Sequence, residues 1–246
     1  MTNLKNKTAI VTGASRGLGR TIAKILAQNG ANVIVNYANN EEQANEVVSE
    51  ISNSGGQAFA IQADISKPIE ITKLFDQTIE KYGQIDIVIN NAGIMITKFT
   101  KDTTEDDFDK TFSVNAKSVF FSMKEASTKM ANNGRVINIS SSVTRVMFPT
   151  YGVYSASKSA VEQMTKVFAK EIGSKGITAN TVSPGPMNTE LFLQGKSEEV
   201  IQRIASLTAF NRIGETADIA PIILFLASEE SQWVTGQNLG INGGMA

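Results

Sequence analysis

Residues 8–19 read Thr8-Ala-Ile-Val-Thr-Gly-Ala-Ser-Arg-Gly-Leu-Gly19. The apolar start predicts a buried strand over Thr8–Thr12, and the glycines at 13, 17 and 19 predict a tight turn into a helix. Such a turn lets backbone N–H groups approach a pyrophosphate at the helix N-terminus. The spacing is Gly-x-x-x-Gly-x-Gly, not the more familiar Gly-x-Gly-x-x-Gly. Taken alone, the motif leaves a purely structural turn open.

The rest of the chain alternates short apolar runs with helical stretches. Strands are predicted at 8–12, 32–36, 57–62, 85–90, 135–139, 177–182 and 238–241. Helices are predicted at 20–29, 41–52, 68–82, 105–130 and 216–227, with another, carrying Tyr154 and Lys158, that runs to about Ser174. This alternation predicts one α/β domain over residues 1–246, a Rossmann-like doubly wound sheet of about seven parallel strands with helices on both faces. The irregular stretch 184–214 is predicted to be a mobile flap over a pocket.

Composition excludes several kinds of chemistry. The 246 residues include no cysteine and no histidine, which excludes disulfides, thiol nucleophiles, histidine triads and His/Cys metal sites. We therefore predict no metal site. The formal net charge is −1, with acidic and basic residues interspersed, so we expect no nucleic-acid partner. We find no signal-peptide pattern and no membrane-spanning apolar run, so we expect a cytoplasmic protein with no membrane partner.

Tyr154 and Lys158 stand four residues apart in Tyr-Ser-Ala-Ser-Lys. Side chains at this spacing share one face of a helix. A lysine ammonium beside a phenol favours the phenolate, so we expect Lys158 to lower the pKa of Tyr154 and to prepare it for proton exchange near neutral pH. None of the other three tyrosines has a lysine four residues on. The pattern by itself is also compatible with an ordinary helix surface.

The second strand bears on the choice of cofactor. NAD sites usually carry an acidic residue about 20 positions after the glycine turn, where it binds the ribose hydroxyls. Here the strand ends in Asn36-Tyr37-Ala38, with no carboxylate to repel a 2′-phosphate. Arg16 in the glycine turn offers that phosphate a cation, although a solvated loop arginine is the alternative. We predict that NADP (NADPH) is preferred over NAD.

Taken together, these motifs resemble the short-chain dehydrogenase/reductase family over essentially the whole chain. They include the glycine turn, Asp64 in Gln-Ala-Asp-Ile, Asn90-Asn-Ala-Gly93, Asn115 in Ser-Val-Asn-Ala, Ser141, the Tyr154/Lys158 pair, and Pro184-Gly185 followed by Thr189. The resemblance, together with the second strand, implies cofactor contacts at Gly13, Ser15, Arg16, Gly17, Leu18, Gly19, Asn36, Tyr37, Ala38, Asp64, Ile65, Asn91, Ala92, Gly93, Tyr154, Lys158, Pro184, Gly185, Met187 and Thr189. Asp64 could instead cap the helix that follows it, and Asn90 and Asn91 could be turn residues.

The resemblance also implies the catalytic residues Asn115, Ser141, Tyr154 and Lys158. Tyr154 would donate a proton to a carbonyl oxygen, Ser141 would polarise that oxygen, and Lys158 would tune Tyr154 and bind the nicotinamide ribose. Asn115 would hold a water that links Lys158 to solvent, although an asparagine in a helix can also simply kink it. Ser140 and Ser142 compete with Ser141. Only the family spacing selects Ser141 among them.

The substrate is less well determined. The pocket is expected to be lined by 94–95, 143–147, Tyr151 and 187–193, and Arg145 is either an anion contact or a solvated residue. The nearest subgroup is similar to bacterial 3-oxoacyl-[acyl-carrier-protein] reductases, which implies an acyl-thioester carbonyl substrate. Such proteins tend to carry basic residues where this chain has Asn132-Asn133, and this difference weakens the prediction of a carrier-protein partner. The nearby cations are Lys129 and Lys175.

Three further expectations concern alternatives and assembly. The first alternative is a reductase of small ketones, quinones, sugars or polyols that uses the same catalytic residues. The second is a dinucleotide-binding sensor without turnover, since a fold does not fix a function. The resemblance also implies a homotetramer, and the helix with Tyr154 has apolar residues beyond one buried stripe.

Overall fold

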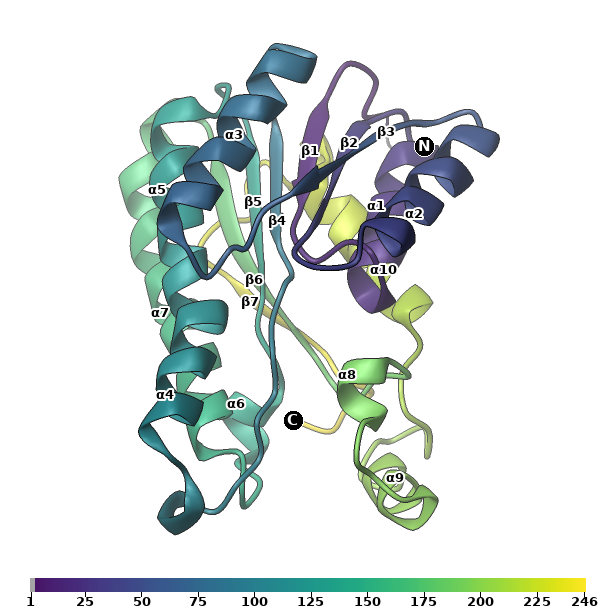
Figure 1. The fold of residues 1–246 in the computed structure, drawn as a ribbon, viewed down its shortest axis with the longest axis vertical. Coiled ribbons are helices and arrows are strands. Elements are labelled where there is room, and N and C mark those ends of the chain that lie inside the picture. Colours follow the sequence, from purple (N-terminus) through teal and green to yellow (C-terminus); the bar gives the residue numbers. More distant parts are fainter. Residues whose placement is uncertain (1–2) are drawn as a thin grey trace.

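The structure is a computed structural model that describes residues 3–246, and its centre is one parallel sheet (Figure 1). The sheet has seven strands in the order β3-β2-β1-β4-β5-β6-β7. The strands are β1 (Thr8–Val11), β2 (Asn32–Tyr37), β3 (Gln57–Gln62), β4 (Ile87–Asn90), β5 (Arg135–Ile139), β6 (Thr178–Pro184) and β7 (Asn238–Ile241). Every residue of β1, β4, β5 and β6 is buried, as expected for strands covered on both faces. The predicted fold class is confirmed.

Helices cover both faces of the sheet, and each face has its own apolar core. On one face α1 (Gly17–Gln28), α2 (Glu41–Asn53) and α10 (Thr216–Ala227) pack onto the strands. On the other lie α3 (Pro68–Tyr82), α5 (Ser118–Lys129) and α7 (Gly152–Ile172) (Figure 1). Burial of a small apolar stripe on each helix therefore fixes the sheet from both sides.

The order in which strands are added to the sheet reverses between β1 and β4. From β1 it builds outward to β2 and β3, then returns to place β4 on the other side of β1. The loops that follow β1 and β4 therefore diverge and leave a crevice at the carboxyl ends of the strands. The glycine turn and Asn91 both lie in this crevice, joined by the hydrogen bond from Asn91 Nδ2 to the Thr12 carbonyl at 2.9 Å.

The predicted helical stretch over about 105–130 is continuous in the structure, but its middle is not α-helical. The segment Ser113–Lys117 forms a π-helical turn between α4 (Glu105–Phe112) and α5, and Asn115 lies within it. A π turn inserts one residue into a helix and often marks a functional position.

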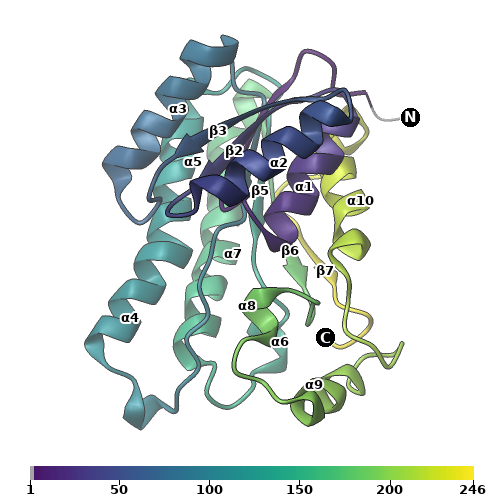
Figure 2. The same cartoon turned by 45° about the vertical axis from the view of Figure 1, so that its right-hand side comes forward.

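The segment predicted as a flap contains two short helices, α8 (Glu190–Leu193) and α9 (Glu198–Ala205), neither of which was predicted. Figure 2 shows them beyond the carboxyl ends of the strands, apart from the two helical layers. A third short helix, α6 (Val143–Val146), follows β5. Among residues 3–246, no helix combines the length and the apolar character needed to cross a membrane.

Candidate active site

A cavity of about 880 Å³ opens at the carboxyl ends of the strands. Residues of the glycine turn line one end, and Ser141, Tyr154 and Lys158 line the other. Its volume lies in the upper part of the range found for cofactor and ligand sites. One cavity thus contains both groups of residues that the sequence selected for different reasons.

The glycine turn is shaped for close backbone approach. Gly13 has a φ of +60°, a conformation that side chains disfavour. At Gly19 a Cβ atom would overlap the Gly13 carbonyl oxygen and lie 2.6 Å from Asn91 Nδ2. The turn leads directly into α1, whose first turn holds no acidic residue and whose N-cap, Arg16, makes no side-chain cap. The N–H groups at this helix end therefore fit an anionic group such as a dinucleotide pyrophosphate.

Asn36 was predicted to contact the cofactor, but the structure places it behind the glycine turn. It is buried and does not line the cavity. Its Oδ1 accepts from the Gly13 N–H at 3.3 Å, and its Nδ2 donates to the Ala63 carbonyl at 3.1 Å. Asn36 therefore joins the turn to β2 and to the loop after β3. The neighbouring Tyr37 and Ala38 do line the cavity.

The remaining predicted cofactor residues lie along the cavity wall. Asp64 lines the cavity, where its predicted contact with adenine stays a prediction, and it does not cap α3: its carboxylate accepts from the Ser66 N–H at 3.0 Å and the Ser66 hydroxyl at 2.7 Å. It thus orders the loop before the helix, whose N-cap is Lys67. The predicted residues that line the cavity are Gly13, Ser15, Arg16, Gly17, Leu18, Gly19, Tyr37, Ala38, Asp64, Ile65, Asn91, Ala92, Gly93, Tyr154, Lys158, Pro184, Gly185, Met187 and Thr189.

Helix α7 holds Tyr154 and Lys158 on one buried face, 7% and 4% exposed. The Lys158 Nζ donates to the Ile139 carbonyl at 2.8 Å and lies 5.9 Å from the centroid of the Tyr154 ring. Ser141 lines the cavity beside Tyr154 and favours its phenolate form, which lowers the pKa of Tyr154. Ser140 instead donates to Glu162 at 2.7 Å. The structure therefore agrees with the choice of Ser141 over Ser140.

The pKa of Tyr154 moves in the opposite direction to the one we expected. Burial raises it to about 12, and Ser141 offsets that rise only in part. Burial also lowers the pKa of Lys158 to about 8. Both shifts arise because removing a charged group from water costs free energy. The expectation failed because helical spacing places the two side chains on one face but carries no information about their desolvation.

Asn115 lies behind the cavity rather than in its wall and is completely buried. Its Oδ1 accepts from the Ile94 N–H at 2.9 Å, while its Nδ2 donates to the Ile94 carbonyl at 2.9 Å and to the Ser157 hydroxyl at 3.1 Å. Both amide hydrogens are thus in use. The side chain connects the loop after β4 to α7. The water that we expected this amide to hold could therefore bind only to the second lone pair of Oδ1.

The end of the cavity near Tyr154 is mostly apolar. Aromatic rings lead toward the Tyr154 hydroxyl, with 5.9 Å between the centroids of Phe148 and Tyr151 and 6.3 Å between those of Tyr151 and Tyr154. Arg145 is absent from the described lining, and its guanidinium donates to the Asn238 carbonyl at 3.5 Å. It therefore does not serve as an anion contact in this cavity.

Sequence reasoning missed several lining residues. They are Asn39, Asn40, Gln43, Ser66, Lys110, Ser113, Val114, Ile139, Phe148 and Met245, while Pro186 and Ile204 also line the cavity and lie within the predicted flap. Lys110 stands three residues before Ser113 and four before Val114, so helical spacing relates these three to one another, and the last two belong to the Ser-Val-Asn-Ala motif. Met245 reaches the cavity only because distant segments fold together, so no local sequence pattern predicts it.

The chain is similar to known proteins over nearly its whole length. A family model described as enoyl-(acyl carrier protein) reductase matches residues 13–246. A short-chain type dehydrogenase/reductase of Picea abies is 41% identical over 98% of this chain and 93% of that protein. A versicolorin reductase of Emericella nidulans is 42% identical over 98% of this chain and 96% of that protein.

Among solved structures, the angucycline C-6 ketoreductase LanV with bound NADP is similar, with a TM-score of 0.94 and 39% identity over 99% of this chain and 97% of that one. These matches cover 98% of this chain for the two relatives and 99% for LanV, whose fold agrees closely with that of this chain. The chain belongs to the short-chain dehydrogenase/reductase family and is an oxidoreductase of the C=O/CH–OH type that this family represents.

Proposed function

We propose that this protein is an NADPH-dependent carbonyl reductase that transfers hydride to a ketone on a bulky apolar molecule. The observation that carries the proposal is the single cavity in which a glycine turn at one end meets Ser141, Tyr154 and Lys158 at the other. The first group fits a dinucleotide, and the second is built to bind and protonate an oxygen atom.

The preference for NADP rests on charge. No carboxylate follows β2 at Tyr37-Ala38, and the Arg16 guanidinium lines the same region of the cavity. The relative LanV was solved with NADP bound. We propose that Arg16 pairs with the 2′-phosphate. One cation in a partly exposed site can make the binding of NADP, which has this phosphate, stronger than the binding of NAD, which has an unsubstituted ribose.

The catalytic residues act on the substrate oxygen. NADPH, when bound, supplies the hydride. Because its pKa is about 12, Tyr154 stays protonated at neutral pH and can donate its proton to the oxygen that gains charge. Ser141 fixes that oxygen by a hydrogen bond, and the nearby Lys158 ammonium stabilises the phenolate that the donation leaves. Asn115 acts as a positioning residue, since it holds the loop beside Lys158.

The lining favours a bulky apolar substrate over an acyl group on a carrier protein. The aromatic row Phe148–Tyr151–Tyr154 offers stacking surfaces that lead to the catalytic hydroxyl. The cations expected to meet an acidic carrier protein are engaged elsewhere, since Lys129 pairs with Asp76 and Glu125, and Lys175 donates to the Ser127 carbonyl. The names of two similar proteins, a versicolorin reductase and an angucycline C-6 ketoreductase, specify reduction of a named compound rather than of a carrier-bound acyl group, which supports this proposal.

A panel assay tests the proposal. NADPH oxidation is followed with polycyclic aromatic ketones, quinones, small ketones, sugars and acetoacetyl-CoA, with NADH in parallel. We expect the highest kcat/KM for an aromatic ketone with NADPH. The highest kcat/KM for acetoacetyl-CoA would instead support the thioester substrate. Binding of NADPH without oxidation by any carbonyl would contradict the enzyme and support a sensor.

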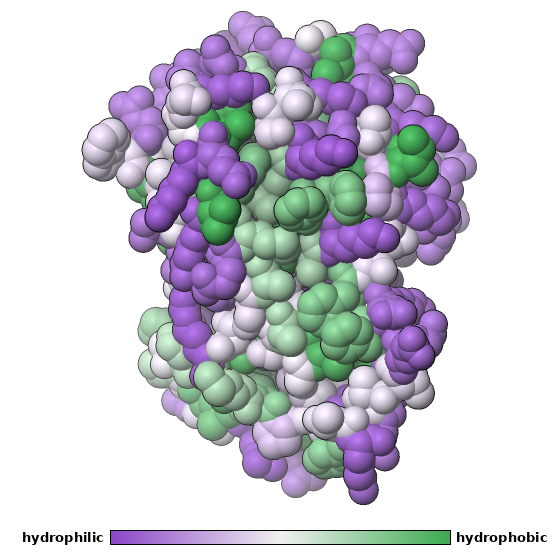
Figure 3. Space-filling view, turned by 90° about the vertical axis from the view of Figure 1, so that its left-hand side faces the viewer, coloured by the Kyte–Doolittle hydropathy of each residue, from purple (hydrophilic) through white to green (hydrophobic). Residues whose placement is uncertain are grey.

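We also propose a homotetramer. The face formed by α4, α5 and α7 carries a band of apolar surface between hydrophilic flanks (Figure 3). Phe108, Phe120 and Val167 on these helices are 46%, 51% and 57% exposed, more than a helix packed only onto its own sheet requires. Light scattering should give a tetramer that Phe120→Lys and Val167→Glu dissociate, and a wild-type monomer would contradict it. The cytoplasmic location stays a prediction.

A further inference from the structure

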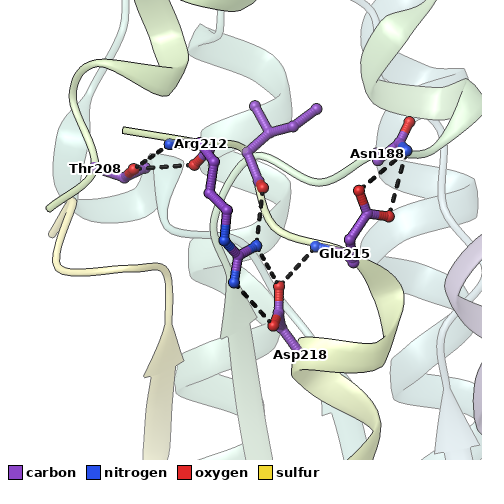
Figure 4. A network of polar contacts seen from close by, with 6 residues as sticks. Asn188, Thr208, Arg212, Glu215 and Asp218 are labelled. Carbon is purple, nitrogen blue, oxygen red and sulfur yellow. Dashed lines mark hydrogen bonds and ion pairs between the residues drawn. The ribbon is translucent and has the colours of Figure 1, made fainter. Parts of the chain in front are cut away.

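The segment 186–218 is held at two places by very different contacts. At its base, Arg212 makes a two-pronged ion pair with Asp218, at 2.7 and 3.1 Å, and Asn188 donates to Glu215 at 3.2 Å (Figure 4). The Gly214 N–H donates to the Pro186 carbonyl at 2.8 Å and joins the two ends of the segment. Its base is therefore tied to the start of α10.

The edge that faces the glycine turn is held far more loosely. None of the four residues of α8 is buried. The contact between this helix and the turn is an ion pair from Arg16 to Glu190 at 2.7 Å, with the two side chains 65% and 68% exposed. Next to it, the Thr189 methyl lies 3.8 Å from where a Cβ on Gly17 would stand. An exposed pair of this kind is weak and sensitive to salt.

This ion pair occupies the cation that a 2′-phosphate would use. Arg16 and Glu190 both line the cavity, together with Tyr37 and Ala38 at the end of β2. The described lining contains one other side-chain carboxylate, that of Asp64, which is engaged with Ser66 and Lys67. A guanidinium holds a phosphate most strongly when two of its N–H groups donate to it, so a phosphate bound in this way would compete with the Glu190 carboxylate, to which Arg16 Nη1 donates.

We infer that Glu190 is a cofactor-selectivity residue: its carboxylate competes with the 2′-phosphate of NADP(H) for Arg16, so that binding of the phosphorylated cofactor releases α8 from the glycine turn. The inference rests on the proposed function, because it takes NADP as the cofactor. A phosphate carries more charge than a carboxylate and displaces it, whereas NAD, which lacks that phosphate, leaves the Arg16–Glu190 pair intact. Glu190 thus weakens the binding of NADP selectively.

Removing the carboxylate tests the inference by equilibrium binding, without turnover. The dissociation constants of NADP⁺ and NAD⁺ are measured by calorimetry at low salt for the wild type and Glu190→Gln. Glu198→Gln is the control, because it makes the same charge change in the same segment, while the Glu198 carboxylate accepts from Gln202 Nε2 at 2.9 Å. We expect Glu190→Gln to bind NADP⁺ more tightly by up to about fivefold, the scale of an exposed ion pair, with NAD⁺ unchanged. Glu198→Gln should change neither constant.

A second variant removes the other partner. In an Arg16→Ala background, Glu190→Gln should no longer tighten NADP⁺ binding, because the contested cation is gone. Equal tightening of both dinucleotides, no tightening, or tightening that persists without Arg16 would overturn the role of Glu190. A wild type that binds neither dinucleotide would overturn the proposed function and this inference together, whereas normal wild-type binding with no effect of Glu190→Gln overturns the inference alone.

Discussion

The two ends of the cavity are built differently. Around Tyr154, the side chains of Asn115, Tyr154 and Lys158 are buried, and Asn115 and Lys158 are fixed by hydrogen bonds to backbone on neighbouring elements. Around Arg16, the charged side chains are exposed, and the helix that faces the turn has no buried residue. Under the proposed function, proton transfer would take place within a buried framework, whereas the cofactor would bind beside α8, a helix that has no buried residue.

The largest expected effect comes from removing the acid at the rigid end. Tyr154→Phe keeps the ring and its packing but removes the proton donor, so kcat should fall roughly 10²–10⁴-fold while the Kd of NADPH stays within about twofold. Steady-state kinetics and calorimetry measure the two quantities. Tyr151→Phe serves as the matched comparison, with a much smaller loss because its hydroxyl does not meet Ser141. Substantial turnover by Tyr154→Phe would refute the assignment of the acid.

Removing Asn115 should disrupt the framework itself. Asn115→Ala leaves the N–H and carbonyl of Ile94 without their side-chain partner, so we expect the free energy of unfolding to fall by about 2–3 kcal/mol. Urea denaturation provides the measurement. Asn39→Ala, an exposed residue at the cofactor end, should cost less than about 0.5 kcal/mol. Equal losses in the two variants would show that the ends do not differ in rigidity.

At the end of the cavity near Arg16, we expect a substitution to change only the affinity for the cofactor. Arg16→Ala should weaken NADPH binding by about tenfold and NADH binding by less than about twofold, because only NADPH has the phosphate that the guanidinium would bind. Fluorescence titration of the reduced cofactors gives both constants. If both cofactors lose affinity equally, Arg16 does not contact the phosphate.

The pH dependence sharpens the account of the buried lysine. With a pKa of about 8, Lys158 loses its proton as the pH rises through that value, and the positive charge that stabilises the Tyr154 phenolate disappears. Tyr154 itself, with a pKa of about 12, stays protonated in this range. The kcat/KM for carbonyl reduction should therefore be level below about pH 7 and fall above about pH 8. A level profile up to about pH 10 would contradict this role of Lys158.

Sequence reasoning succeeded where local pattern determines structure. Buried apolar runs such as Ile87–Asn90 located the strands, and the glycine turn, with Gly19 packed against the Gly13 carbonyl, located the cofactor end. It failed where packing decides. The π turn at Asn115, the raised pKa of Tyr154 and the lining by Met245 all depend on segments far away in sequence.

Hydrogen–deuterium exchange with and without NADP⁺ tests the contrast between the two ends most directly. In the free protein we predict fast exchange over residues 189–211 and slow exchange over α7 (Gly152–Ile172). Addition of NADP⁺ should change the exchange rate of residues 189–211 but not that of α7. NAD⁺ should change the flap less. Equal protection of the two regions, or a response to NADP⁺ that is the same in both, would contradict the division of the cavity into a rigid catalytic end and a movable cofactor end.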